Sequence, residues 1–322
     1  MDYKYWSIIN TIVRPTLWVF FALSGFLLLE RPIKSVTNFY LTRISKAVIG
    51  LVVYSIIYQT AWDTNNFNSI RDSIKLISYK QMLSGTVPWA EHFWFVYSIL
   101  ALYILTPFIS DCFKSMTNKR FIYFVSIVLG FMVMLPILKN FFNVSININI
   151  MIGNEAFFYY ILGYTILRLE LFRFKKIIYI SGILTLILTY QFNFNSKLAL
   201  NLYTTSINMV ILSIFYFVLF YNCSFISKFS GTLARVITHV SKSTYSIFLI
   251  HIYVMRHLPN YSYFPEETYR YQLIINIILI FVVSFIFTQI IDFIVTNPIN
   301  KLVTKLIKHC DPRKFKTLPV SK

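Results

Sequence analysis

Apolar runs of about membrane-spanning length recur along the whole chain, with short charged segments between them. A helix needs about 20 mostly apolar residues to cross a bilayer, and a spanning segment must satisfy its backbone hydrogen bonds internally. Windows of this kind cover residues 13–29, 44–62, 93–110, 121–138, 156–169, 177–192, 200–221, 241–255 and 273–295. The sequence therefore predicts an all-α, polytopic integral membrane bundle of about nine helices, forming a single domain over residues 1–322.

The composition excludes a soluble globule. The chain is 57% hydrophobic and only 13% charged, with a mean hydropathy of +0.63, which leaves too little polar surface to cover a water-soluble protein. A net charge of +18 would suggest a nucleic-acid partner in a soluble protein. Here the positions of the basic residues between apolar runs explain the charge, so we expect a lipid bilayer and no nucleic acid as partner.

The distribution of basic residues predicts the orientation. If connections alternate between the two sides, one side holds most of the 30 Lys and Arg residues, and the positive-inside rule makes that side cytoplasmic. We therefore expect a multi-pass cell-membrane protein with a cytoplasmic C-terminus. Cys112, Cys223 and Cys310 then lie on the reducing side, so no disulfide is expected. Nine spans leave Met1 outside, which favours a preceding span that this chain lacks; in the alternative, Lys4 and Arg14 are carried across.

Polar residues stand at the start of the third apolar run. Glu91 and His92 precede it, and Trp89 and Trp94 flank them. Ionisable groups at such a boundary are costly unless they are solvated, paired or functional. Histidine can accept a proton from a sugar hydroxyl, and a nearby carboxylate can fix its tautomer, although adjacent residues need not touch. The tryptophans fit either an aromatic belt at the membrane interface or stacking on a sugar ring.

Four further residues are candidates for the site, and two of them, His251 and Arg43, have two interpretations each. His251, inside the eighth run, fits a functional group or an interhelical hydrogen bond. Arg43 stands just before the second run and fits a ligand for donor phosphates or a positive-inside anchor. Ser24 and Gly25 interrupt the first run and fit close helix packing. The sequence contains no phosphate-binding glycine loop, metal-ligand cluster or G-x-S-x-G motif, so we expect no metal.

Several stretches together resemble the acyltransferase 3 family of membrane O-acyltransferases, which modify cell-envelope glycans. They are FFALSGFLL (20–28), FYLTRISK (39–46), HFWFVYSILALYILTP (92–107), FFYYILGYTIL (157–167) and STYSIFLIHIYV (243–254). Each stretch is loose alone, but their order and spacing follow the family over nearly the whole chain.

The resemblance implies a ten-helix membrane enzyme, an acyltransferase that transfers groups other than aminoacyl groups. It would take an acyl group, commonly acetyl, from cytoplasmic acyl-CoA (acetyl-CoA) as a donor substrate, with no bound cofactor. The acceptor would be a hydroxyl of a surface or lipid-linked polysaccharide. On this basis Arg43 would bind the donor, His92 and His251 would transfer protons, and Trp89 and Trp94 would contact the sugar. Glu91 would assist there, and Ser24 and Gly25 would let helices approach at the site.

The chain departs from the family pattern at its start. The family's first helix carries an arginine followed by the histidine held to be catalytic, whereas Arg14 is followed at that spacing by Ser24 and Gly25. We therefore expect that the first family helix is absent from this chain. Two alternatives stay open: a catalytically degenerate membrane scaffold, and a saccharide transporter or flippase. Few glycines and few charges within the runs count against the transporter.

Overall fold

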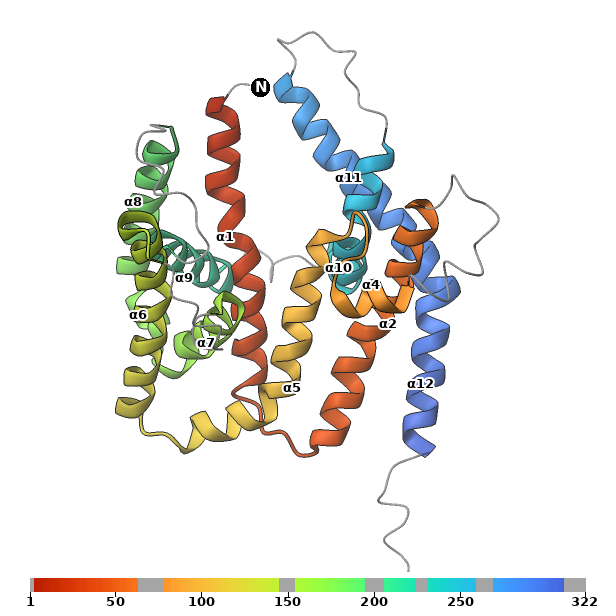
Figure 1. Cartoon of the computed structure of the whole chain (residues 1–322), viewed down its shortest axis with the longest axis horizontal. Helices are drawn as coiled ribbons and strands as arrows, with labels where there is room; N and C mark the ends of the chain where they lie inside the picture. Colours follow the sequence, from red (N-terminus) through yellow and green to blue (C-terminus); the bar gives the residue numbers. More distant parts are fainter. Residues whose placement is uncertain are drawn as a thin grey trace, which may run out of the picture. The chain divides into compact units, whose positions relative to one another are not determined.

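The computed structural model describes residues 3–62, 78–144, 154–194, 206–223, 231–258 and 269–309, and their regular structure is helical (Figure 1). The α-helices are α1 (Tyr3–Leu28), α2 (Val36–Trp62), α4 (Ser78–Ser84), α5 (Trp94–Ser115), α6 (Asn118–Phe142), α7 (Glu155–Arg168), α8 (Lys175–Phe194), α9 (Ile207–Tyr221), α10 (Thr232–His257), α11 (Tyr269–Ile291) and α12 (Asn297–His309). Short 3₁₀ helices cover Glu91–Phe93 and Leu171–Phe174, and a π-helix covers Asp292–Thr296.

The prediction of an all-α polytopic membrane fold is confirmed, and each of the nine apolar windows overlaps a helix. Within the described residues, five helical segments are long and apolar enough to cross a membrane: Ile8–Leu28, Val36–Thr60, Glu91–Ser115, Asn118–Leu135 and Ile274–Val303. The window at 156–169 is the shortest of the nine. It forms α7, whose 14 residues reach only about 21 Å, less than the hydrocarbon thickness.

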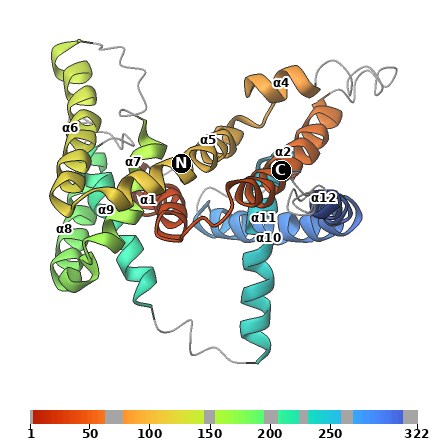
Figure 2. The same cartoon turned by 90° about the horizontal axis from the view of Figure 1, so that it is seen from below.

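The chain folds into two compact units, each assembled from segments remote in sequence. Unit 1 contains Met1–Lys34 and Ile104–Phe229, and unit 2 contains Ser35–Tyr103 and Ser230–Lys322. In Figure 2, α1 and α7 lie together within unit 1, and α10 runs across α11 within unit 2. Cys112 and Cys223 are free thiols in unit 1, and Cys310 lies outside the described residues.

In unit 1, the short helix α7 is buried along nearly its whole length and packs against α1. The contact is close because two glycines meet opposite backbones: a Cβ at Gly25 would lie 1.7 Å from the Tyr160 carbonyl oxygen, and one at Gly163 would lie 1.7 Å from that of Ala22. Because neither glycine has a side chain, the two backbones touch, as they do at small residues between membrane helices. This reciprocal glycine contact fixes the crossing of α1 and α7.

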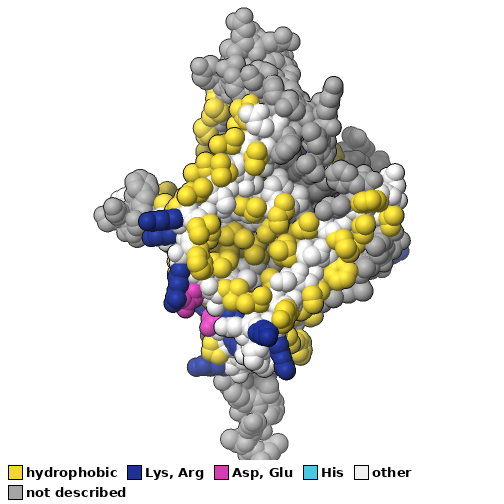
Figure 3. Space-filling model, turned by 90° about the vertical axis from the view of Figure 1, so that its left-hand side faces the viewer, with side chains coloured by type: hydrophobic (Ala, Val, Ile, Leu, Met, Phe, Trp, Pro, Cys, Tyr) yellow, Lys and Arg dark blue, Asp and Glu magenta, His cyan; other side chains and the backbone are white. Residues whose placement is uncertain are grey.

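The outer face of unit 1 is apolar. Figure 3 shows a broad hydrophobic area with Lys and Arg side chains at its lower and left margins. On α8, side chains that are more than half exposed include Ile180, Ile183, Leu184, Ile187 and Leu188. Apolar exposure on this scale is unfavourable in water and favourable against lipid, so we assign this face to the bilayer.

Arg168, at the end of α7, joins three helix ends of unit 1. Its Nε donates to Asn118 Oδ1 at 3.0 Å, and its two terminal nitrogens donate to the carbonyls of Phe113 and Met116. Its guanidinium also lies 4.6 Å from the Phe121 ring centroid. Sequence alone counted this arginine only as a topology charge, but the structure gives it a stabilising role.

We therefore predict that Arg168→Lys destabilises the protein. Lysine keeps the charge but lacks the planar fork that reaches several acceptors at once, and stranded polar groups cost about 1–3 kcal/mol each. Thermal unfolding in mild detergent should show a lower midpoint for Arg168→Lys and no change for Arg173→Lys, whose partner is the exposed Glu170. Equal midpoints for both variants would contradict the assignment.

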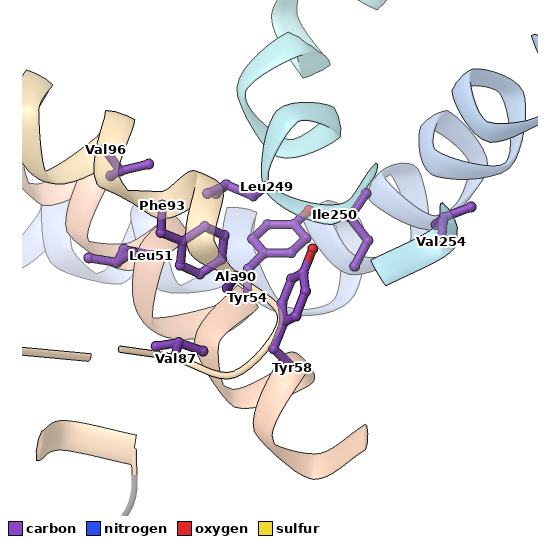
Figure 4. Close-up of a cluster of buried hydrophobic side chains, with 10 residues drawn as sticks. All are labelled: Leu51, Tyr54, Tyr58, Val87, Ala90, Phe93, Val96, Leu249, Ile250 and Val254. Atoms are coloured by element: carbon purple, nitrogen blue, oxygen red, sulfur yellow. The ribbon is translucent and has the colours of Figure 1, made fainter. Parts of the chain in front are cut away.

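Unit 2 is built around a cluster of buried side chains where α2 and α10 meet the first turn of α5 and the segment that precedes it. Its members are Leu51, Tyr54, Tyr58, Val87, Ala90, Phe93, Val96, Leu249, Ile250 and Val254. Figure 4 shows the hydroxyl ends of Tyr54 and Tyr58 lying toward Ile250 of α10. The Tyr58 hydroxyl accepts a hydrogen bond from the Tyr253 backbone N–H at 2.8 Å. These contacts fix the registration of α2 against α10.

Asp292 lies at the start of the π-helix in unit 2. Its Oδ1 accepts a hydrogen bond from the Ser246 hydroxyl of α10 at 3.1 Å, and one turn earlier Gln289 donates to the Ser243 hydroxyl at 2.8 Å. The contacts described here make Asp292 part of the α10–α11 packing.

Candidate functional site

Two histidines from distant parts of the chain lie side by side in unit 2. His92 is the middle residue of the 3₁₀ helix Glu91–Phe93, and His251 lies near the end of α10. Their ring centroids are 5.1 Å apart with the rings at 71° to each other. The structure therefore brings together the two histidines selected from the sequence.

Backbone carbonyls define the tautomer of each ring. His251 Nδ1 lies 2.7 Å from the Phe248 carbonyl oxygen, and His92 Nε2 lies 3.2 Å from that of Leu249. A carbonyl only accepts, so each of these nitrogens carries the hydrogen. In the neutral rings, His251 Nε2 and His92 Nδ1 are then the basic atoms. His92 Nδ1 is buried and has no hydrogen-bond partner among the described residues.

Aromatic rings surround the histidine pair. The His92 ring centroid lies 4.8 Å from Phe93, 5.4 Å from Phe248 and 5.9 Å from Tyr58. Both histidines are only partly exposed. The surroundings therefore exclude much of the water while leaving part of each ring accessible, which strengthens electrostatic interactions at the pair.

A second group of side chains adjoins the pair at the end of α10. Arg256 places its guanidinium carbon 5.4 Å from the Trp89 ring centroid, and its Nη2 lies 3.9 Å from Glu91 Oε2. Trp89 also meets His257 edge-on at 5.8 Å. Glu91 thus faces Arg256, while the Leu249 carbonyl fixes the His92 tautomer.

Sequence reasoning did not select Arg256, His257 or Tyr58 for this site. A signal for the first two was present, because they are basic residues at the end of the apolar run that contains His251. For Tyr58 the sequence gave no signal, since it is one of 23 tyrosines and its position beside His92 depends on how α2 packs.

The remaining predicted site residues lie on α1, α2 and α5, and Trp94 directly follows the 3₁₀ helix that contains His92. Arg43 is exposed on the second turn of α2, 15 residues before Tyr58, or about 22 Å along the helix axis. Trp94 opens α5 and is 43% exposed. Ser24 and Gly25 belong to unit 1, where the Ser24 hydroxyl donates to the Phe20 carbonyl of its own helix at 3.0 Å.

These features define a polytopic helical membrane protein with a paired-histidine site in one of its units. A scan against protein-family models matches Acyl_transf_3, described as an acyltransferase domain, over residues 2–293. The chain belongs to the acyltransferase 3 family, so it is a membrane acyltransferase that transfers groups other than aminoacyl groups. A search of curated proteins found no match, and a search of solved structures found none either.

Proposed function

We propose that this protein transfers an acyl group, most simply acetyl, from cytoplasmic acyl-CoA to a hydroxyl of a surface or lipid-linked polysaccharide. Family membership supplies the acyl transfer. The observation that carries the acceptor chemistry is the contact between His92 and His251, with ring centroids 5.1 Å apart. Each ring has one nitrogen committed to a backbone carbonyl and one left basic.

In the proposed reaction, His251 acts as general base. Its Nε2 takes the proton of the acceptor hydroxyl as the hydroxyl oxygen attacks the thioester carbon. A new C–O ester bond forms, the C–S bond breaks, and the coenzyme A sulfur leaves and takes up a proton. The adjacent His92, whose basic Nδ1 is buried, is the second candidate for proton transfer.

The proposed donor and acceptor ends lie apart along α2. Arg43 would bind the phosphates of acyl-CoA, and the histidines would bind the acceptor. The separation of about 22 Å along the axis is a large part of the thickness of a bilayer core. We propose the orientation that places Arg43 and the C-terminus in the cytoplasm. Trp89 and Trp94 would contact the sugar, and Gly25 with Ser24 would support helix packing in unit 1.

Membranes containing the full chain test this proposal when they are supplied with acetyl-CoA labelled in the acetyl group. We expect label to enter alkali-labile esters of the glycan fraction, and membranes without the protein to give none. Free coenzyme A should appear in equal amount. Glycan that crosses the membrane without acquiring label would indicate a transporter. The absence of both labelled esters and glycan transport would indicate a scaffold, and either result would overturn the proposal.

A further inference from the structure

A rim of charged and aromatic side chains adjoins the histidine pair of unit 2. We call Trp89, Glu91, Tyr253, Arg256 and His257 the Arg256 rim. Tyr253 stacks on His257 at 4.2 Å with the planes 25° apart, and His257 meets Trp89 edge-on. The rim thus offers flat apolar faces beside a guanidinium, a combination suited to a ring that bears a negative charge.

Arg256 is held in place without being strongly neutralised. The Trp89 ring orients its guanidinium through a cation–π contact. Its pair with Glu91 spans 3.9 Å, longer than a hydrogen bond, and the Glu91 side chain is 76% exposed. Exposed ion pairs of this kind contribute about 0–1 kcal/mol. An incoming carboxylate or phosphate can therefore displace Glu91 and form the bidentate pair that Glu91 does not.

The backbone at Trp89 adopts a costly conformation to form this rim. Trp89 has φ +61°, in the left-handed region that a bulky side chain adopts only at a cost of about 1–3 kcal/mol. The segment is held by hydrogen bonds from the Ala90 N–H to the Val87 carbonyl at 3.1 Å and from the Tyr97 hydroxyl to the Met82 carbonyl. Such strain persists where surrounding structure enforces it, and it commonly marks ligand sites.

Ring contacts connect the rim to the histidines. The ring centroids of Tyr253 and Tyr58 are 5.7 Å apart, and those of Tyr58 and His92 are 5.9 Å apart. Tyr253 also follows His251 by two residues on α10. Glu91, which faces Arg256 at 3.9 Å, is also the residue next to His92. The rim and the histidine pair are thus neighbours within unit 2.

We infer that the acceptor is an anionic saccharide, whose carboxylate or phosphate binds Arg256 while a neighbouring hydroxyl faces His251. The placement of the hydroxyl rests on the proposed function, whereas the binding of the anion does not. Arg256 is then a specificity-determining residue. Trp89 and His257 position the sugar and the guanidinium.

The test measures binding without acyl-CoA. The full chain in phosphatidylcholine nanodiscs is dialysed against labelled glucose, glucuronate and glucose 1-phosphate. We expect both anionic probes to bind at least about tenfold more tightly than glucose, as a charge-assisted contact provides. Arg256→Gln should abolish this difference and Arg256→Lys should keep part of it. Arg235→Gln, which removes an exposed arginine at the other end of α10, should change nothing.

Glu91→Gln gives a result that a merely structural role would not. Removing the competing carboxylate should tighten binding of the anionic probes by about two- to fivefold, the size of an exposed ion pair, and leave glucose binding unchanged. Equal binding of all three probes would overturn the inference. The inference would also be overturned if the protein retained added phosphatidylglycerol in a way that depends on Arg256 and showed no preference among the sugars. Arg256 would then bind a lipid headgroup.

Different results refute the acyl transfer and the anion site at Arg256. Charge-selective binding without labelled esters would leave the anion site standing and refute the acyl transfer. Labelled esters on neutral and anionic glycans alike, with no effect of Arg256→Gln, would support the transfer and refute the anion site.

Discussion

His251→Ala is expected to lower acyl transfer at least about a hundredfold, because positioned general bases contribute roughly 10²–10⁴ to a rate. The reason is specific to one atom. The Phe248 carbonyl holds the hydrogen on Nδ1, so Nε2 is the atom that takes up a proton. The measurement is the initial rate of label transfer from acetyl-CoA in membranes adjusted to equal protein content.

His251→Asn separates proton transfer from packing. Its side-chain amide can still donate to the Phe248 carbonyl but cannot accept the hydroxyl proton, so it should be as slow as the alanine variant while unfolding at the wild-type temperature. Added imidazole should partly restore His251→Ala and not His251→Asn. The control is His239→Ala on the same helix, which removes an exposed histidine that meets Phe285 edge-on at 5.7 Å and should keep full activity. Full activity in both His251 variants would refute the assignment.

The helices were predictable from sequence because the requirement that creates them is local. An apolar run of membrane length must satisfy its own backbone, so composition and run length suffice to predict the segments that became α1, α2, α5, α6 and α11. One helix outside this set is α7, where the same apolar character serves burial inside unit 1 rather than contact with lipid. Run composition does not distinguish these two environments.

The histidine site was only partly predictable. His92 and His251 stood out because ionisable groups in apolar runs are rare, but their contact depends on how a 3₁₀ turn meets α10. The sequence neighbour Glu91 suggested itself as the partner of His92, yet the structure directs it to Arg256. From the sequence, Arg168 counted only among the basic residues that set the orientation, and Arg256 was not selected for the site. Only their contacts show that Arg168 joins helix ends and that Arg256 lies in the candidate site.

Gly25→Ala and Gly163→Ala are each expected to lower the thermal unfolding midpoint by roughly 10 °C, or to prevent assembly altogether. The added Cβ would lie 1.7 Å from a backbone carbonyl oxygen on the facing helix in both cases. A backbone cannot swing aside as a flexible side chain can, so α1 and α7 must separate along the crossing. Overpacking of this kind costs about 3 kcal/mol or more.

Gly130→Ala in α6 is the matched control, since nothing lies within 4 Å of a Cβ at that position. It should be neutral or slightly stabilising, because alanine is the better helix former by about 1 kcal/mol. Detergent-solubilised variants are compared by light scattering during heating. The double variant Gly25→Ala/Gly163→Ala should lose less than the sum of the singles, because one separation of the helices relieves both contacts. In the opposite outcome, Gly25→Ala and Gly163→Ala both unfold at the wild-type temperature, as the control does. That result would show that the reciprocal glycine contact does not hold α1 against α7.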